Sequence, residues 1–425
     1  MLLAHIADLH LGKTLHERDL LPDQAFMLDG VLDLLARRRP AALLIAGDVY
    51  DRSIPTPEAL ALFDSFLSRA LRAAQALVVA VIPGNHDSAA RLSFGAELLE
   101  RAGVHFRTRA EDCARPILVK RDGERLAIWP LPFLTPGAFD SSDRDSAGGA
   151  DGADGAEGEA EEMRGAREEA LSTQDETRRE PGESARSRRP TALRSQAELF
   201  AEGINRIRPA LLSDSANVLL AHCFAAGGAE SESERLFVGG AEQVDPRCFA
   251  DFDYVALGHL HRHQSAGPRA LYPGSPLAYS FGEGGDERGI LFVDVRQGGF
   301  EAELAPLRPL RNLVRLEGPF SALSAPGAFP EHREAYVEAR LTDGAPVLNP
   351  AEALRINFPN LLSVRQAAFE LLPSAASAPG PRIEGGRSVV EDFRAFHAEM
   401  RGAEPGEAMT RLFTKLLEDA HRETA

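Results

Sequence analysis

Cysteine is scarce in this sequence: its 425 residues include only Cys113, Cys223 and Cys248. The number is odd and no two have the C-x-x-C spacing, which argues against a disulfide framework and a thiolate zinc site. Scarce cysteine is typical of a reducing compartment. The sequence also lacks a basic N-terminal signal region and any apolar run near the ~18 residues that span a membrane. We therefore expect a cytoplasmic protein.

An excess of basic residues is also missing. The formal net charge is −17 and the pI is about 5.2, which argues against a general basic coat for nucleic acid. Net charge does not describe a single cleft, which bound cations can make positive, so a polyanionic substrate is not excluded. The hydrophobic content of 44% is ample for a buried core, and the length allows two or three domains.

Polar residues follow each of three apolar runs early in the chain, Leu2 to Ala7, Ala41 to Ala46 and Leu77 to Ile82. These polar residues are Asp8 and His10, then Asp48 and Asp51, and then Asn85, His86 and Asp87. Helix-like spacing of apolar residues over Pro22 to Arg38 and Pro57 to Ala74 separates the runs, so the order predicts a layered α/β unit. Because loops at the carboxyl ends of such strands converge on one rim, we expect the polar residues to meet there.

The same pattern returns further along the chain. Asn217 to Ala221 reads as a strand that ends at His222, and Asp253 to Leu257 ends at Gly258, followed by His259 and His261. A lone histidine is more often structural than functional, but so many polar strand ends in one chain favour a site. Carboxylate, amide and imidazole ligands together suit a divalent metal.

Three further regions differ in composition from this core. Residues 140–195 are rich in Gly, Ala, Ser and charged residues, so we expect a disordered acidic insert that loops out from the surface. It is either an inert loop or a partner-binding arm. Residues 307–380 read as a smaller module with strands and a short helix, capped by Asn349 with Pro350 first. Residues 387–425 carry two amphipathic helix patterns, which either pack on their own domain or bind a partner.

These motifs resemble those of the calcineurin-like metallophosphoesterases, whose pattern is D-x-H, G-D-x-x-D, G-N-H-D/E, a lone His and G-H-x-H. The resemblance implies an α/β fold, a β-sandwich flanked by helices over residues 1–306, with a smaller α+β capping domain and C-terminal helices. It also implies two divalent metal ions, with Mn²⁺ expected. One would be held by Asp8, His10 and His261, the other by Asn85, His222 and His259, and Asp48 would bridge them.

The same resemblance implies roles for three residues beside the ligands. His86 is similar to the family's general acid or transition-state stabiliser at the leaving oxygen, and Asp87 would steady it. Asp51 stands where archaeal and eukaryotic members have a histidine that positions DNA or the leaving group. Cys223 follows His222 where the family usually has glycine, which either tightens a turn or offers a reactive thiol.

Within the family, the chain is most similar to the DNA nucleases. That closer likeness lies in segments without a predicted ligand, including Trp129 to Phe133 and Gly274 to Glu283. It implies an exonuclease and endonuclease that processes duplex DNA ends and hairpins in repair, recombination and replication. Implied partners are a coiled-coil ATPase, bound by the helices of 387–425, and a second copy of the chain within a heterotetramer.

Two surfaces and two other functions complete the expectations. The capping domain 307–380 would hold DNA through Arg308, Arg311 and Arg315. Helix surfaces near Phe63 and Phe66 either form the dimer contact or belong to the core. A small-substrate phosphatase or phosphodiesterase on the same scaffold is the first alternative. A non-catalytic scaffold is the second, although such proteins lose ligands that this chain keeps.

Overall fold

The computed structural model describes residues 1–139, 195–229, 231, 243–367, 389–401 and 404–423. The predicted acidic insert, apart from Ser195, lies outside the described residues. The chain divides into two compact units. The first consists of Met1–Leu341 and Asn349–Arg365, and the second of Thr342–Leu348 and Gln366–Ala425.

Two six-stranded sheets form the centre of the first unit. The first sheet has the order β14-β13-β1-β4-β5-β6, with β1 (Leu2–Ile6), β4 (Ala42–Ala46), β5 (Val78–Ile82), β6 (Val104–Phe106), β13 (Gly289–Arg296) and β14 (Gly299–Pro306). The second has the order β11-β12-β10-β9-β8-β7, with β7 (Ile117–Arg121), β8 (Glu124–Leu131), β9 (Ala216–His222), β10 (Tyr254–Gly258), β11 (Gln264–Ser265) and β12 (Ala270–Tyr272). The strands β1, β4 and β5 run parallel, as do β8, β9 and β10, so their carboxyl ends lie together.

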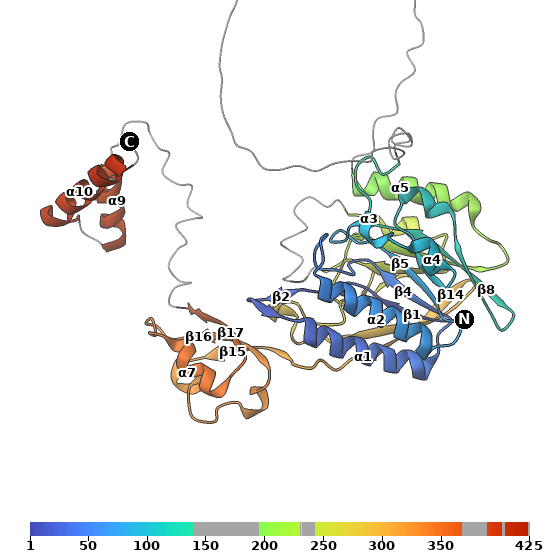
Figure 1. Ribbon diagram of the computed structural model, residues 1–425, viewed down its shortest axis with the longest axis horizontal. Coiled ribbons are helices and arrows are strands. Elements are labelled where there is room, and N and C mark those ends of the chain that lie inside the picture. Colours follow the sequence, from blue (N-terminus) through green and yellow to red (C-terminus); the bar gives the residue numbers. More distant parts are fainter. Residues whose placement is uncertain (140–194, 230, 232–242, 368–388, 402–403, 424–425) are drawn as a thin grey trace, which may run out of the picture. The chain divides into compact units, whose positions relative to one another are not determined.

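The alternation of side chains along these strands explains the layers. In β1, Leu3 belongs to a buried cluster shared by both sheets, whereas Ala4 and Ile6 belong to a cluster shared with helices. The helices α1 (Leu21–Arg38) and α2 (Pro57–Ala73) cover the first sheet on that side, and α5 (Gln196–Ile207) covers the second sheet on the other (Figure 1). The prediction of an α/β sandwich flanked by helices is therefore confirmed.

Short elements complete the first unit. They are β2 (Thr14–Leu15), β3 (Arg18–Asp19), α3 (Ala89–Leu92), α4 (Ala96–Glu100), α6 (Phe320–Leu323) and the 3-10 helices Ala110–Ala114, Arg208–Ala210, Pro246–Phe249, Phe281–Glu283 and Pro330–His332. The sequence of Phe94 to Ala102 predicts one helix, and the structure has α4 within that range. Gly95 has a φ of 72°, which a continuing helix cannot contain, and α4 starts only after it.

A three-stranded sheet of order β15-β16-β17 lies beyond the sandwich, built from β15 (Leu313–Gly318), β16 (Tyr336–Leu341) and β17 (Leu361–Gln366). Helix α7 (Pro350–Asn357) starts with proline as predicted. Asn349 occupies the N-cap position as predicted, but its backbone is left-handed, with a φ of 47°, and its side chain forms no capping hydrogen bond. Asp23, at the start of α1, accepts a hydrogen bond of 2.8 Å from the Tyr336 hydroxyl, which ties the small sheet to the sandwich.

Two helices of the second unit, α9 (Val389–Arg401) and α10 (Glu407–Glu423), match the predicted pair. The rings of Phe393 and Phe413 stack at 4.0 Å between them. Among the described residues, no helix is both long and apolar enough to cross a membrane. Phe63 and Phe66 are buried in the core of the first unit, so they do not form an apolar surface for a dimer.

Candidate metal centre

All seven predicted metal ligands lie at the rim where the carboxyl ends of five strands meet. Strands β1, β4 and β5 place Asp8, His10, Asp48 and Asn85 there, and β9 and β10 place His222, His259 and His261 there. All but Asn85 are buried. The two sheets meet closely at this rim because the Asp8 carboxylate accepts a hydrogen bond of 3.0 Å from the His259 backbone amide. The sandwich therefore brings both halves of the predicted set together.

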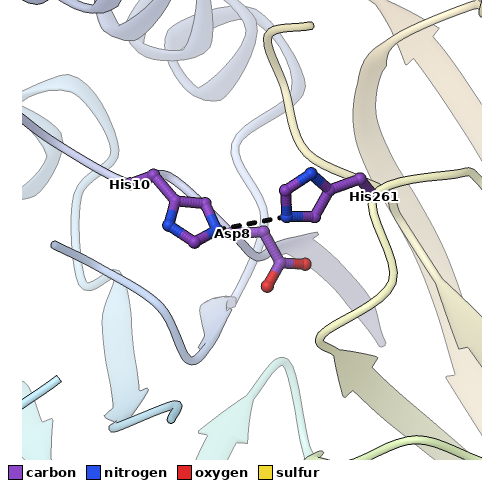
Figure 2. A group of neighbouring side chains, drawn as sticks. All are labelled: Asp8, His10 and His261. Atoms are coloured by element: carbon purple, nitrogen blue, oxygen red, sulfur yellow. Dashed lines mark hydrogen bonds between the residues drawn. The ribbon is translucent and has the colours of Figure 1, made fainter. Parts of the chain in front are cut away.

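Asp8, His10 and His261 form a first cluster. His10 Nε2 lies 3.1 Å from His261 Nε2. Figure 2 shows the two imidazoles facing each other with the Asp8 carboxylate beside them, and their potential ligand atoms all lie within 4.8 Å of one another. Two nitrogen atoms and a carboxylate converging on one point form a donor set that suits a divalent ion.

Asn85, His222 and His259 form a second cluster around one amide oxygen. Asn85 Oδ1 lies 3.0 Å from His222 Nε2 and 3.2 Å from His259 Nδ1. The second ring nitrogen of His222, Nδ1, lies 2.8 Å from the Ala46 backbone carbonyl, which accepts its proton and leaves Nε2 as the electron-pair donor. This cluster contains two imidazoles and an amide oxygen in place of the carboxylate.

Asp48 lies between the two clusters. Its Oδ2 is 3.7 Å from His10 Nε2 and 3.5 Å from His222 Nε2. Its Oδ1 accepts a hydrogen bond of 2.9 Å from the His86 backbone amide, which fixes the carboxylate in that place. One carboxylate within reach of a histidine from each cluster is the arrangement that a bridging ligand requires.

Four of the seven residues have a left-handed backbone. The φ angles are 55° at Asp8, 42° at His10, 50° at Asp48 and 111° at His259. Residues other than glycine rarely adopt such angles, and those that do gather at functional sites. The strand-to-loop turns therefore hold these side chains in directions that ordinary extended or helical backbone would not give.

The charge states of the site match what a metal ion needs. Burial lowers the pKa of His10 to about 4 and that of His259 to about 3, and it also lowers the pKa of His222. Burial alone would raise the pKa of Asp48, but the neighbouring His222 and His10 hold it below its usual range. At neutral pH these three imidazoles are thus uncharged while Asp48 is ionised, and both forms bind metal.

The donor set itself supports this assignment. The first cluster offers two imidazole nitrogens and a carboxylate, and the second offers two imidazole nitrogens and an amide oxygen, with Asp48 between them. Nitrogen and oxygen donors gathered in this way suit a divalent ion. The residues present therefore fit a divalent metal centre.

The three predicted catalytic residues lie directly beside Asp48. The His86 ring is half-buried, and its Nδ1 lies 2.8 Å from the Asp51 backbone carbonyl. The Asp51 side chain pairs with Lys13 Nζ at 2.6 Å, and His10 and Lys13 keep its pKa below the usual range despite burial. The backbone carbonyl of Asp51 thus orients the His86 ring.

The Asp87 carboxylate binds backbone amides of two loops. Its carboxylate accepts hydrogen bonds of 2.9–3.0 Å from the backbone amides of Val49, Tyr50 and Gly84, and so it joins the loops after β4 and β5. Burial and the charge of Asp48 raise its pKa to about 7, although these amides oppose the shift. Asp87 therefore fixes the loop that carries His86, and its predicted role in steadying the His86 ring stays a prediction.

The structure also bears on the predicted roles of Cys223 and of the arginines expected to contact DNA. Cys223 is buried, and burial raises the pKa of its thiol well above the ordinary value, so it is not a reactive thiolate. Arg311 pairs with Asp23 at 3.3 Å, and Arg315 pairs with the buried Glu338. These two arginines are held by the protein's own carboxylates, whereas Arg308 is exposed.

Residues 1–155 match the family model described as Calcineurin-like phosphoesterase. Over most of its length it is similar to two curated proteins, each named as the D subunit of the nuclease SbcCD. That of Staphylococcus saprophyticus subsp. saprophyticus is 28% identical over 87% of this chain and 86% of its own length. That of Staphylococcus epidermidis is 28% identical over the same shares. The predicted resemblance and the predicted class, a phosphodiester hydrolase, are confirmed.

A solved structure, that of TT1561 of Thermus thermophilus, covers 71% of this chain and 98% of its own. Its TM-score is 0.37 and the sequence identity is 14%, so this likeness carries no argument about the site.

Proposed function

We propose that the chain is the nuclease subunit of an SbcCD-type complex, a metal-dependent enzyme that cuts duplex DNA at ends and hairpins in repair, recombination and replication. The observation that carries this proposal is the position of Asp48, between two histidine-rich clusters in a phosphoesterase domain. Similarity over 87% of the chain to a protein named as a subunit of the nuclease SbcCD supports DNA as the substrate.

Two divalent ions, Mn²⁺ in our proposal, belong to this centre. Asp8, His10 and His261 would hold one ion, Asn85, His222 and His259 would hold the other, and Asp48 would contact both. When bound, such a pair neutralises phosphate charge and lowers the pKa of an attacking water. Nitrogen donors in both clusters favour manganese over magnesium, which prefers oxygen ligands.

The protein's own residues orient and protonate the leaving group. Nδ1 of His86 is committed to the Asp51 carbonyl, so Nε2 is the ring atom that gives a proton to the leaving oxygen. The His86 ring is only half-buried, so a substrate can reach it. Lys13 lies beside Asp51 and adds a positive charge at the edge of an otherwise acidic and neutral site.

Residues 307–380 serve in this proposal as a capping domain that helps to hold DNA, with Arg308 available for a phosphate. Arg311 and Arg315 instead stabilise the position and structure of that domain through their carboxylate partners. Binding of duplex DNA should weaken steeply with salt, because each phosphate contact releases counterions.

The helices in residues 387–425 bind the partner in this proposal, a coiled-coil ATPase of the SbcC type that makes duplex cleavage ATP-dependent. Exposed apolar side chains on these helices, Phe396, Met409, Leu412 and Leu416, support a helix-in-groove contact. A second copy of the chain completes a heterotetramer, and Phe94 and Leu98 are exposed apolar residues that could take part.

The decisive test is cleavage of linear and hairpin duplex DNA by the purified chain with Mn²⁺, with and without the ATPase partner. We expect His86→Ala to lower the rate by about 10²–10⁴-fold while it keeps its metal content. His16→Ala, which changes an exposed histidine, is the matched control.

Hydrolysis of a small chromogenic phosphodiester, without DNA cleavage even with the partner, would instead indicate a small-substrate phosphoesterase. A purified chain without affinity for Mn²⁺ would indicate a non-catalytic scaffold.

A further inference from the structure

The segment from Gly274 to Arg288, here called the wrapping segment, contains no predicted ligand, yet it encloses the first cluster. Arg288 donates hydrogen bonds to the backbone carbonyls of His261 at 3.2 Å, Ser275 at 2.9 Å and Leu277 at 3.0 Å. Gly274 has a φ of 78°, and a Cβ there would lie 2.7 Å from the His261 carbonyl oxygen. The segment therefore packs directly on the backbone that carries His261.

The wrapping segment also holds the loop that carries the other two members of this cluster. The Tyr279 hydroxyl donates a hydrogen bond to the backbone carbonyl of Leu9, which lies between Asp8 and His10. The Tyr279 ring meets His10 and His261 edge to face, with centroid distances of 5.4 and 5.8 Å. One side chain thus contacts both stretches of chain that form the cluster.

Glu283 is the charged centre of this segment. It is fully buried, and its Oε1 lies 3.5 Å from Nδ1 of His261, the ring atom on the far side from His10. Its Oε2 lies 2.9 Å from Nη2 of Arg288 and accepts a hydrogen bond of 3.0 Å from the Tyr279 amide. A buried carboxylate needs such partners to remain charged.

We propose that Glu283 is a positioning residue that prepares His261 for the metal ion; this rests on the metal centre proposed above. Its carboxylate draws the imidazole proton to Nδ1, so that Nε2 presents its electron pair toward His10 and Asp8. A histidine with a carboxylate behind it is a more basic ligand than one held by a neutral carbonyl, as His222 is by Ala46.

The contact of 3.5 Å between His261 and Glu283 is longer than a hydrogen bond, so it acts here as a charge–dipole contact. The network around Glu283 holds the carboxylate in place behind the ring.

The test is a titration of the metal-free full-length chain with Mn²⁺ by calorimetry, before and after Glu283→Gln. The amide keeps the size of the side chain but removes its charge. We expect affinity for one of the two ions to fall about 10–100-fold, the usual effect of losing such support. Glu287→Gln, which removes an exposed carboxylate from the same segment, should leave both affinities unchanged.

Unchanged Mn²⁺ affinity in a folded Glu283→Gln variant would overturn the proposal. Should the variant fail to fold, ¹⁵N NMR of the wild-type metal-free chain reads the tautomer directly. We expect His261 with its proton on Nδ1, and a proton on Nε2 would refute the role of Glu283. If the wild-type chain binds no Mn²⁺ while this tautomer is found, the proposed function fails and the positioning of His261 stands.

Discussion

At the scale of residues, the metal centre depends on left-handed backbone conformations that are unfavourable for residues other than glycine. Asp8, His10 and Asp48 have φ angles of 42–55°, each costing about 1–2 kcal/mol relative to ordinary right-handed backbone. Glycine would remove this cost, but it would also remove the ligand. The sandwich must therefore supply the stability that keeps these turns in place, through the buried strands on either side.

The glycine before Asp48 shows how little room remains at this point. Gly47 has a φ of 87°, and a Cβ there would lie 2.2 Å from Nδ1 of His222. That nitrogen already bonds to the Ala46 carbonyl, so the ring cannot move away without losing its orientation. The small residue is thus needed for a ligand that lies far away in the sequence.

We predict that Gly47→Ala weakens Mn²⁺ binding at least tenfold and destabilises the fold by more than about 1 kcal/mol, the cost of the left-handed backbone alone. Calorimetry and thermal unfolding would measure the two effects. Gly285→Ala is the control, because a Cβ at that position meets no atom within 4 Å. Equal metal affinity in Gly47→Ala and the wild type would contradict the role assigned to this close contact.

At the scale of elements, the sequence predicted the strands and their polar ends well because burial repeats locally along the chain. Strand β4 is buried at every residue and matches the predicted run Ala41 to Ala46 almost to the residue. The meeting of all seven predicted ligands follows from parallel strands that end on one side. Local pattern and sheet geometry together were therefore sufficient to place these polar residues at one rim, whereas their division into ligands and catalytic residues came from the resemblance.

The contacts that no local pattern encodes were missed. Glu283 and Tyr279 act on His261 and Leu9 from a different part of the chain, and their only signal was a segment that resembles the nuclease members without containing a ligand. The partners of Arg311 and Arg315 are carboxylates brought near by folding, which spacing along the chain cannot reveal. The break at Gly95 could have been predicted from the glycine itself.

For the C-terminal helices, we predict that changing Leu412 and Leu416 of α10 together to Gln abolishes binding of the coiled-coil ATPase. Both side chains are 58% exposed, so their loss removes apolar surface from the contact without opening a core. Hydrolysis of a small phosphodiester should stay at the wild-type rate. Arg411→Gln, an exposed polar change on the same helix, serves as the control in a pull-down with the purified ATPase. If the double variant still bound the ATPase, the contact would have to lie on another part of the chain.

At the scale of the whole molecule, the buried neutral histidines make stability depend on pH. Burial lowers the pKa of His5 to about 3, as it lowers those of His10 and His259 to about 4 and 3. In the unfolded chain each has a pKa near 6.5. Between these values the unfolded state binds more protons, so stability is present above pH 6.5 and is lost as the pH falls. Asp87, with its pKa raised to about 7, opposes this trend as a single group.

We therefore predict that the thermal unfolding midpoint of the metal-free chain falls steadily from pH 7 to pH 5. Each extra proton bound by the unfolded state contributes about 1.4 kcal/mol per pH unit. His5 lies away from the metal centre, where its Nδ1 and the Tyr254 hydroxyl are 2.8 Å apart, so His5→Gln removes one titrating group and should reduce the slope. The exposed His16→Gln should leave the slope unchanged. A midpoint that is constant or rises as the pH falls would show that these histidines are not held neutral in the folded protein.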